Sequence, residues 1–165
     1  MTFYNRPPAR PLHGAALPKF WRPKVAPAEQ LTCQIIHWDL ITAFTRGTAT
    51  FKDLRDWIET GMTYAKMVEL LIADGVAIKP EAAEALNDQA ALYEGVIARY
   101  GKTGRVGFSG YELTVVRLAA CVMDELIQLD RHGIAGLAAL WSTERMRQAR
   151  KTGGFPLTNF KNSRK

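Results

Sequence analysis

Several features that would assign a sequence to a protein class at once are missing from this one. Only two of its 165 residues are cysteines, Cys33 and Cys121, which is too few for a disulfide framework. No apolar run approaches the roughly 18 to 20 residues of a membrane-spanning helix, and residues 1–10 lack the apolar segment of a secretory signal. We therefore expect a reduced, cytoplasmic, globular protein, and its length fits one domain with a single hydrophobic core.

Acidic residues are absent from both ends of the chain. Residues 1–28 carry five basic residues, and residues 145–165 carry seven. Residues 29–144 instead hold 16 acidic and 10 basic residues, so the net charge of +6 comes from the ends. An acidic body with basic ends favours contact between the ends and an anionic partner. The alternative is that the ends lie on the acidic body or confer solubility.

The N-terminal arm, residues 1–27, contains six of the eight prolines, which excludes a long helix or a central strand. It also carries five large apolar side chains, more than a solvated linker needs. We expect an extended strap that packs on the body or on a partner. The apolar side chains are Phe3, Tyr4, Leu17, Phe20 and Trp21.

Helical periodicity begins at residue 28 and continues almost to the end of the chain. Thr50 and Asp53, like Ser109 and Glu112, have the three-residue spacing of an N-terminal capping box, and Pro80 suits the first turn of a helix. The predicted helices are 28–46, 51–74, 80–100, 110–131 and 134–151. Strand signals are limited to four residues, 105–108. The sequence therefore predicts an all-α, five-helix bundle over 28–151, with the Pro-rich strap before it and a basic tail over 152–165.

The glycine-rich segment 101–110 is the first candidate for a ligand-binding loop. Gly101-Lys102-Thr103 imitates the end of a phosphate-binding loop, but that motif needs an earlier glycine at Val96 and a preceding strand. We interpret the segment as a connection between helices that uses glycine for positive φ at several positions. Phe108 is its expected apolar anchor.

Catalytic and metal-binding patterns are weak. Cys33 and His37 lie one helical turn apart, but zinc needs three or four ligands, and Cys121 stands among apolar residues where a small buried side chain is expected. We expect a buried cysteine beside a hydrogen-bonded histidine. The adjacent Asp124 and Glu125 point about 100° apart on a helix and form no acid–base pair alone. We predict no enzyme, no metal and no cofactor.

Cations and aromatic residues alternate near the C-terminus, a pattern that suits either of two partners. Backbone neutralisation with base stacking suits a nucleic acid, whereas aromatic anchors suit pockets on a protein. The expected partner-binding residues are Trp21, Arg105, Phe108, Arg145, Arg147, Arg150, Lys151, Phe155, Phe160, Lys161, Arg164 and Lys165.

Five short motifs and Asp124 resemble a family of small, uncharacterised helical proteins of proteobacterial phages and plasmids. The motifs are His37-Trp38, Arg46-Gly47, Asp56-Trp57, the helix end from Leu71 to Gly75 and the segment 103–113. The resemblance covers about residues 37–128. In that family an aromatic residue follows the Thr-Gly-Arg triplet and a histidine precedes the aspartate, where this chain has Val106 and Met123.

This resemblance implies a mobile-element setting but no activity. Together with the charge pattern, it leads us to expect a non-enzymatic accessory protein that binds and modulates a larger protein machine of replication, transfer or defence, with inhibition as the favoured form of modulation. The alternative is a nucleic-acid-binding protein that uses its basic C-terminal helix and tail.

Overall fold

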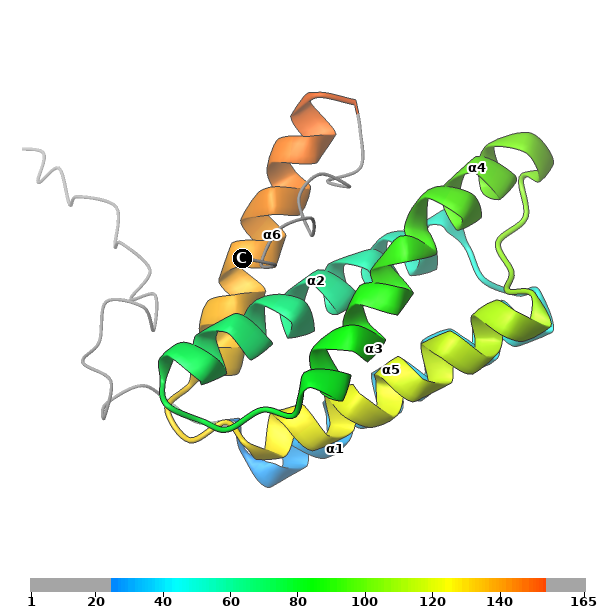
Figure 1. Cartoon of the computed structure of the whole chain (residues 1–165). Helices are drawn as coiled ribbons and strands as arrows, with labels where there is room; N and C mark the ends of the chain where they lie inside the picture. The colour runs from blue at the N-terminus through cyan, green and yellow to red at the C-terminus, as the bar shows by residue number, and fades with distance from the viewer. Residues whose placement is uncertain (1–24, 154–165) are drawn as a thin grey trace, which may run out of the picture.

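A computed structural model describes residues 25–153 of the chain (Figure 1). Between these residues every regular element is a helix and no strand forms, so the all-α prediction is confirmed. None of these helices combines the length and the apolar character that crossing a membrane requires. The helices are α1 (Pro27–Arg46), α2 (Phe51–Ala73), α3 (Pro80–Ala91), α4 (Tyr93–Thr103), α5 (Gly110–Gln128) and α6 (Ile134–Lys151).

Both predicted capping boxes form. Before α2, the Asp53 amide donates to Thr50 Oγ1 at 3.3 Å, and the Thr50 amide donates to the Asp53 carboxylate at 2.7 Å. Before α5, the Glu112 amide donates to Ser109 Oγ at 3.3 Å, and the Ser109 amide donates to the Glu112 carboxylate at 2.6 Å. Each box satisfies backbone groups that the first helical turn leaves unpaired.

The third predicted helix is divided in two at Leu92. Its backbone angles, φ −81° and ψ −19°, stay in the helical region, so α3 and α4 follow each other without a loop and count as one interrupted helix of a five-helix bundle. Tyr93 is buried against Gly61 of α2. A Cβ atom at Gly61 would lie 1.8 Å from the Tyr93 hydroxyl, so the close contact between this junction and α2 requires glycine.

The glycine-rich segment differs from its prediction in two ways. Gly101, Lys102 and Thr103 form the last turn of α4, so these residues cannot surround a phosphate as a loop does. Between 101 and 110 only Gly104 has positive φ, at 66°, where several such glycines were expected. Arg99 of α4 closes the connection by donating to Glu112 at 2.7 Å and to the Gly107 carbonyl at 3.1 Å.

The helices pack as two antiparallel pairs that meet at α2. One pair is α2 and α6, whose packing is the most extensive in the bundle; the other is α1 and α5, which run side by side in Figure 1. The Trp38 indole reaches Asp124 near the end of α5, while the Phe44 carbonyl lies beside Gly107 before its start. This places α1 and α5 in opposite directions, with α3 packed across α5 and α2.

Candidate protein-binding surface

Helix α1 has apolar side chains on two faces. The inner face buries His37, Ile41 and Phe44. The outer face carries Leu31, Ile35 and Trp38, which are 56%, 52% and 37% exposed. These three residues, which we name the α1 stripe, are spaced by four and three positions and therefore lie along one line of the helix. They gave the helical periodicity in the sequence, yet the core does not contain them.

Trp38 joins the α1 stripe to α5. Its indole nitrogen donates to Asp124 Oδ2 at 3.1 Å. An exposed aromatic ring held by a hydrogen bond to a neighbouring helix loses little freedom when a partner covers it. The ring is therefore a preorganised contact at the boundary between the two helices.

Helix α5 also has an apolar line outside its core face. Tyr111 and Leu118 are 74% and 57% exposed, Leu129 is exposed, and Val115 and Val122 are half-buried. Spacings of four and three residues recur along this line. We name it the α5 seam, and its members are Tyr111, Val115, Leu118, Val122, Glu125 and Leu129.

Cys121 lies beside the α5 seam and is exposed, so the expectation that it is a small buried side chain is wrong. It sits about 160° around the helix from the buried Met123 side at 100° per residue. The apolar neighbours that suggested burial are divided between two faces of the same helix: Ala119 is buried and Leu118 is exposed.

Helices α1 and α5 are acidic overall, whereas α6 is basic. Helices α1 and α5 together carry five acidic and two basic residues. Helix α6 carries four basic residues and one acidic residue. The structure therefore keeps the two charge signs on different helix pairs.

The four cations predicted on α6 are all exposed but do not share one face. At 100° per residue, Arg147, Arg150 and Lys151 lie within an arc of about 100°, and Arg145 points about 160° away from Arg147. Arg147 donates twice to the Glu144 carboxylate at 2.7 Å. The guanidinium of Arg145 lies 5.4 Å from the centre of the Trp141 ring. Only three of the four are brought together, and one of those is already paired.

The remaining predicted contact residues fall into two groups. Arg105 is exposed in the connection before α5, as expected. Phe108 stacks on Phe44 with ring centres 4.4 Å apart and meets Trp57 edge-on at 5.0 Å, so it anchors the connection in the core and offers a partner little surface. The others lie outside the described residues: Trp21, Phe155, Phe160, Lys161, Arg164 and Lys165.

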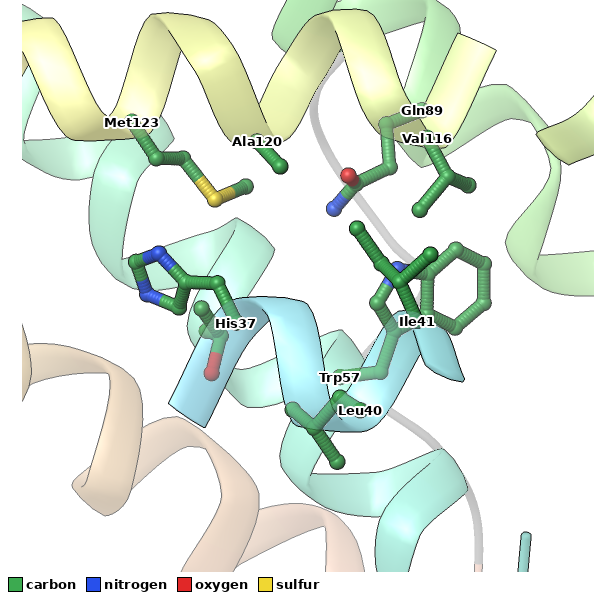
Figure 2. Close-up of a pocket in the computed structure, with 9 residues that line it drawn as sticks. His37, Leu40, Ile41, Trp57, Gln89, Val116, Ala120 and Met123 are labelled. Atoms are coloured by element: carbon green, nitrogen blue, oxygen red, sulfur yellow. The ribbon is translucent and has the colours of Figure 1, made fainter. Parts of the chain in front are cut away.

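A small cleft lies beneath α1, between α2, α3 and α5 (Figure 2). Its empty volume is about 240 Å³ with the open mouth included, and His37, Trp57 and Gln89 supply polar groups to a mostly apolar wall. The buried Trp57 Nε1 has no hydrogen-bond partner. The cleft is smaller than the roughly 300 to 1,000 Å³ typical of ligand pockets, so it does not suggest a substrate site.

His37 is buried, as expected, but it is not hydrogen-bonded, which corrects that part of the prediction. Its Nδ1 lies 3.6 Å from Asp124 Oδ1, within ion-pair distance but beyond hydrogen-bond distance, and neither atom has a hydrogen-bond partner. Burial lowers the pKa of His37 despite the opposing attraction of Asp124. The half-buried Cys33 has a raised pKa through burial and the nearby Glu29 charge, which disfavours the reactive thiolate. Within residues 25–153 no three His, Cys, Asp or Glu side chains are grouped to hold a metal.

Comparison of the chain with protein-family models, with characterised proteins and with solved structures finds no match in any of the three. The functional argument therefore depends on the geometry of these surfaces.

Proposed function

We propose that the chain is a non-enzymatic accessory protein of a mobile genetic element that binds a larger protein machine and modulates it. The observation that carries this proposal is the α1 stripe. Large apolar residues arranged in a line and turned to solvent favour a protein interface, because a helix that serves only the fold directs such a line inward. The mobile-element setting is supported by the resemblance over residues 37–128.

The charge around the α1 stripe specifies the chemistry of the partner. Exposed Asp39 lies next to the stripe, and Glu125 lies on the neighbouring helix. A complementary segment therefore has apolar anchors flanked by lysine or arginine. This differs from the expected contact through the basic ends, which suits an acidic partner.

The interior polar groups support a binding role over a catalytic one. Tyr64 and Tyr93 are buried, and burial raises the pKa of each hydroxyl far above its usual value. His37 packs edge-on against Tyr64 with ring centres 5.1 Å apart. These groups are enclosed by packing where a general acid or base needs access to a substrate.

A nucleic-acid partner is the second candidate, and the three clustered cations of α6 favour it. Their pairing with Glu144 and the acidic face across the molecule weigh against it. A salt titration separates the two. If Arg147, Arg150 and Lys151 bind a duplex, the logarithm of the association constant decreases linearly with the logarithm of the salt concentration. The magnitude of that slope should fall by about 0.9 for each phosphate contact removed by alanine substitution.

The proposal is tested by capture from the native host with tagged chain, in lysates with and without nuclease treatment. A captured protein is then purified and its affinity for the chain is measured directly. We expect Ile35→Glu to weaken that affinity by about 100-fold, since a charge would replace a central apolar anchor. Ile72→Glu is the matched control: it changes an equally exposed isoleucine, 56% against 52%, on α2. Equal effects of the two substitutions, or capture that disappears after nuclease treatment, would contradict the proposal.

A further inference from the structure

The α5 seam has the spacing of a helix that packs on another helix. Its six members follow intervals of four, three, four, three and four residues, which is the heptad interval of two helices with interlocking side chains. Five of the six are apolar, and they extend over the whole of α5 to Leu129 just beyond its end. The core face of α5 is filled by residues such as Val116, Ala120 and Met123, and the half-buried Val122 of the seam packs partly against the same core.

We propose that a second copy of this chain docks on the α5 seam, with the two α5 helices antiparallel about a twofold axis near residue 120. The proposal rests on the proposed function, because it treats the exposed apolar residues of α1 and α5 as interaction surfaces. It identifies the partner of the α5 surface as a second copy of the chain. In a twofold contact the same patch serves both copies, so a seam must complement itself.

The seam complements itself in this register. Its first and last members, Tyr111 and Leu129, lie equally far from residue 120, so each faces the other across the axis. The same symmetry sets Leu118 against Val122, and Val115 against Glu125, whose methylene groups cover the valine while its carboxylate turns outward. The first two pairings give four apolar contacts, two of each type, and the full length of the seam is used.

The charges of this face favour the antiparallel direction. Glu125 of the seam and Arg117, on the side of α5 that faces α1, are both exposed and lie five residues after and three residues before the axis. In an antiparallel twofold pair equivalent sides of the two helices meet, so Glu125 of one copy comes within two residue positions, about 3 Å along the helix, of Arg117 of the second, twice in the dimer. A parallel twofold pair would bring opposite sides together and set Glu125 against Glu125 in the seam, away from Arg117, which like-charge repulsion disfavours.

Cys121 supplies a reporter for this arrangement. It is exposed, it lies on the same flank as Arg117, and it is one residue from the axis. The two copies of Cys121 are therefore near neighbours in the proposed dimer. Cys33 lies on α1 and is half-buried, so a Cys33→Ser background leaves one thiol to follow.

The first experiment measures the mass of the purified full chain by sedimentation equilibrium from about 1 to about 100 µM. We expect a species of twice 18.4 kDa at the upper end. Leu118→Glu should raise the dimer dissociation constant at least about 100-fold, because each dimer loses the anchor twice. Ile72→Glu, which changes an equally exposed residue on α2 (56% against 57%), should leave it unchanged. Circular dichroism verifies that both variants stay folded. A monomer throughout the range would overturn the proposal.

The second experiment tests direction and register with charge exchanges. Glu125→Arg and Arg117→Glu should each weaken dimerisation by about fivefold to tenfold, and the double variant should restore it. In the Cys33→Ser background, a short bis-maleimide should link Cys121 to Cys121 in the parent and fail in Leu118→Glu. A double variant no better than the single ones, together with no cross-link, would overturn the antiparallel contact.

Two other occupants of the seam give different results. If residues 1–24 of the same chain cover it, the full chain is monomeric and removal of those residues creates the dimer, which overturns the proposal for the full chain. If only a different protein binds there, neither form dimerises. Failure of the proposed function is seen separately, since Ile35→Glu lies on α1 and its effect is measured on partner affinity.

Discussion

The two antiparallel helix pairs are built in opposite ways. Between α2 and α6 the polar groups are paired: Thr63 and Ser142 hydroxyls lie 2.6 Å apart, and Thr143 donates to Glu59 at 2.7 Å. Between α1 and α5, His37 Nδ1 and Asp124 Oδ1 face each other at 3.6 Å without a hydrogen bond. The outer surfaces are reversed as well, since α6 exposes cations and α1 exposes apolar side chains.

This difference indicates that the two helix pairs have different roles. Paired polar groups inside and charge outside are what a stable, solvated helix pair requires. Unpaired polar groups inside and apolar residues outside cost stability and solubility, and such costs concentrate where a protein serves a function beyond its fold. We infer that α2 and α6 hold the structure and that α1 and α5 form the contact surface.

The largest effect is expected at the contact between α2 and the junction of α3 with α4. Gly61→Ala places a methyl group against the Tyr93 hydroxyl and Gln89, both buried, so backbone or ring must move. We expect a loss of about 3 kcal/mol in the free energy of unfolding, measured by urea denaturation. Gly95→Ala is the control: nothing lies within 4 Å of its Cβ position, and helix propensity should give a gain of about 0.5–1 kcal/mol. Similar results for the two variants would show that the close contact is not formed.

A smaller effect separates the two pairs directly. Ser142→Ala removes a buried, hydrogen-bonded hydroxyl between α2 and α6 and should cost about 1–2 kcal/mol. His37→Phe removes an unpaired ring nitrogen between α1 and α5 and should cost less, or stabilise. Both are measured by urea denaturation at pH 7. If the histidine substitution cost more than the serine substitution, the contrast between the pairs would be wrong.

Local sequence signals predicted the helices well and the surfaces poorly. Thr50, Ser109 and Pro80 marked helix starts because a capping residue acts within one turn. The break at Leu92 had no such signal, since its backbone stays helical.

The contact surfaces were missed because apolar periodicity does not say which face is inside. Leu31 and Ile35 have the spacing of a core line, yet the buried line of α1 is His37, Ile41 and Phe44. On α5 a second line of four-and-three spacing was visible in the sequence as well. Two apolar lines on one helix exceed what a single core can cover, and that excess was the available signal.

The smallest expected effect is a pH dependence that belongs to the α1 and α5 pair alone. Burial lowers the pKa of His37 in the folded chain below its usual value near 6.5. The facing groups are Asp124 of α5, whose charge opposes this shift, and Tyr64 of α2, whose own pKa is raised by burial. As the pH falls below about 6.5, the unfolded chain binds a proton that folded His37 resists, so the free energy of unfolding decreases until the folded pKa is passed.

His37→Phe removes this titration and leaves the other two histidines in place. Urea denaturation of parent and variant between about pH 7 and pH 5 should therefore give diverging curves, with the parent losing more stability on acidification. Ser142→Ala, on the other helix pair, should run parallel to the parent over the same range. Because His37 and Trp38 approach the two oxygens of the same Asp124 carboxylate, the acidification that charges His37 changes the competition for that carboxylate. Partner affinity should then change with pH in the parent and not in His37→Phe. Parallel stability curves for all three proteins would mean that burial does not lower the pKa of His37. The polar groups between α1 and α5 would then be as well paired as those between α2 and α6.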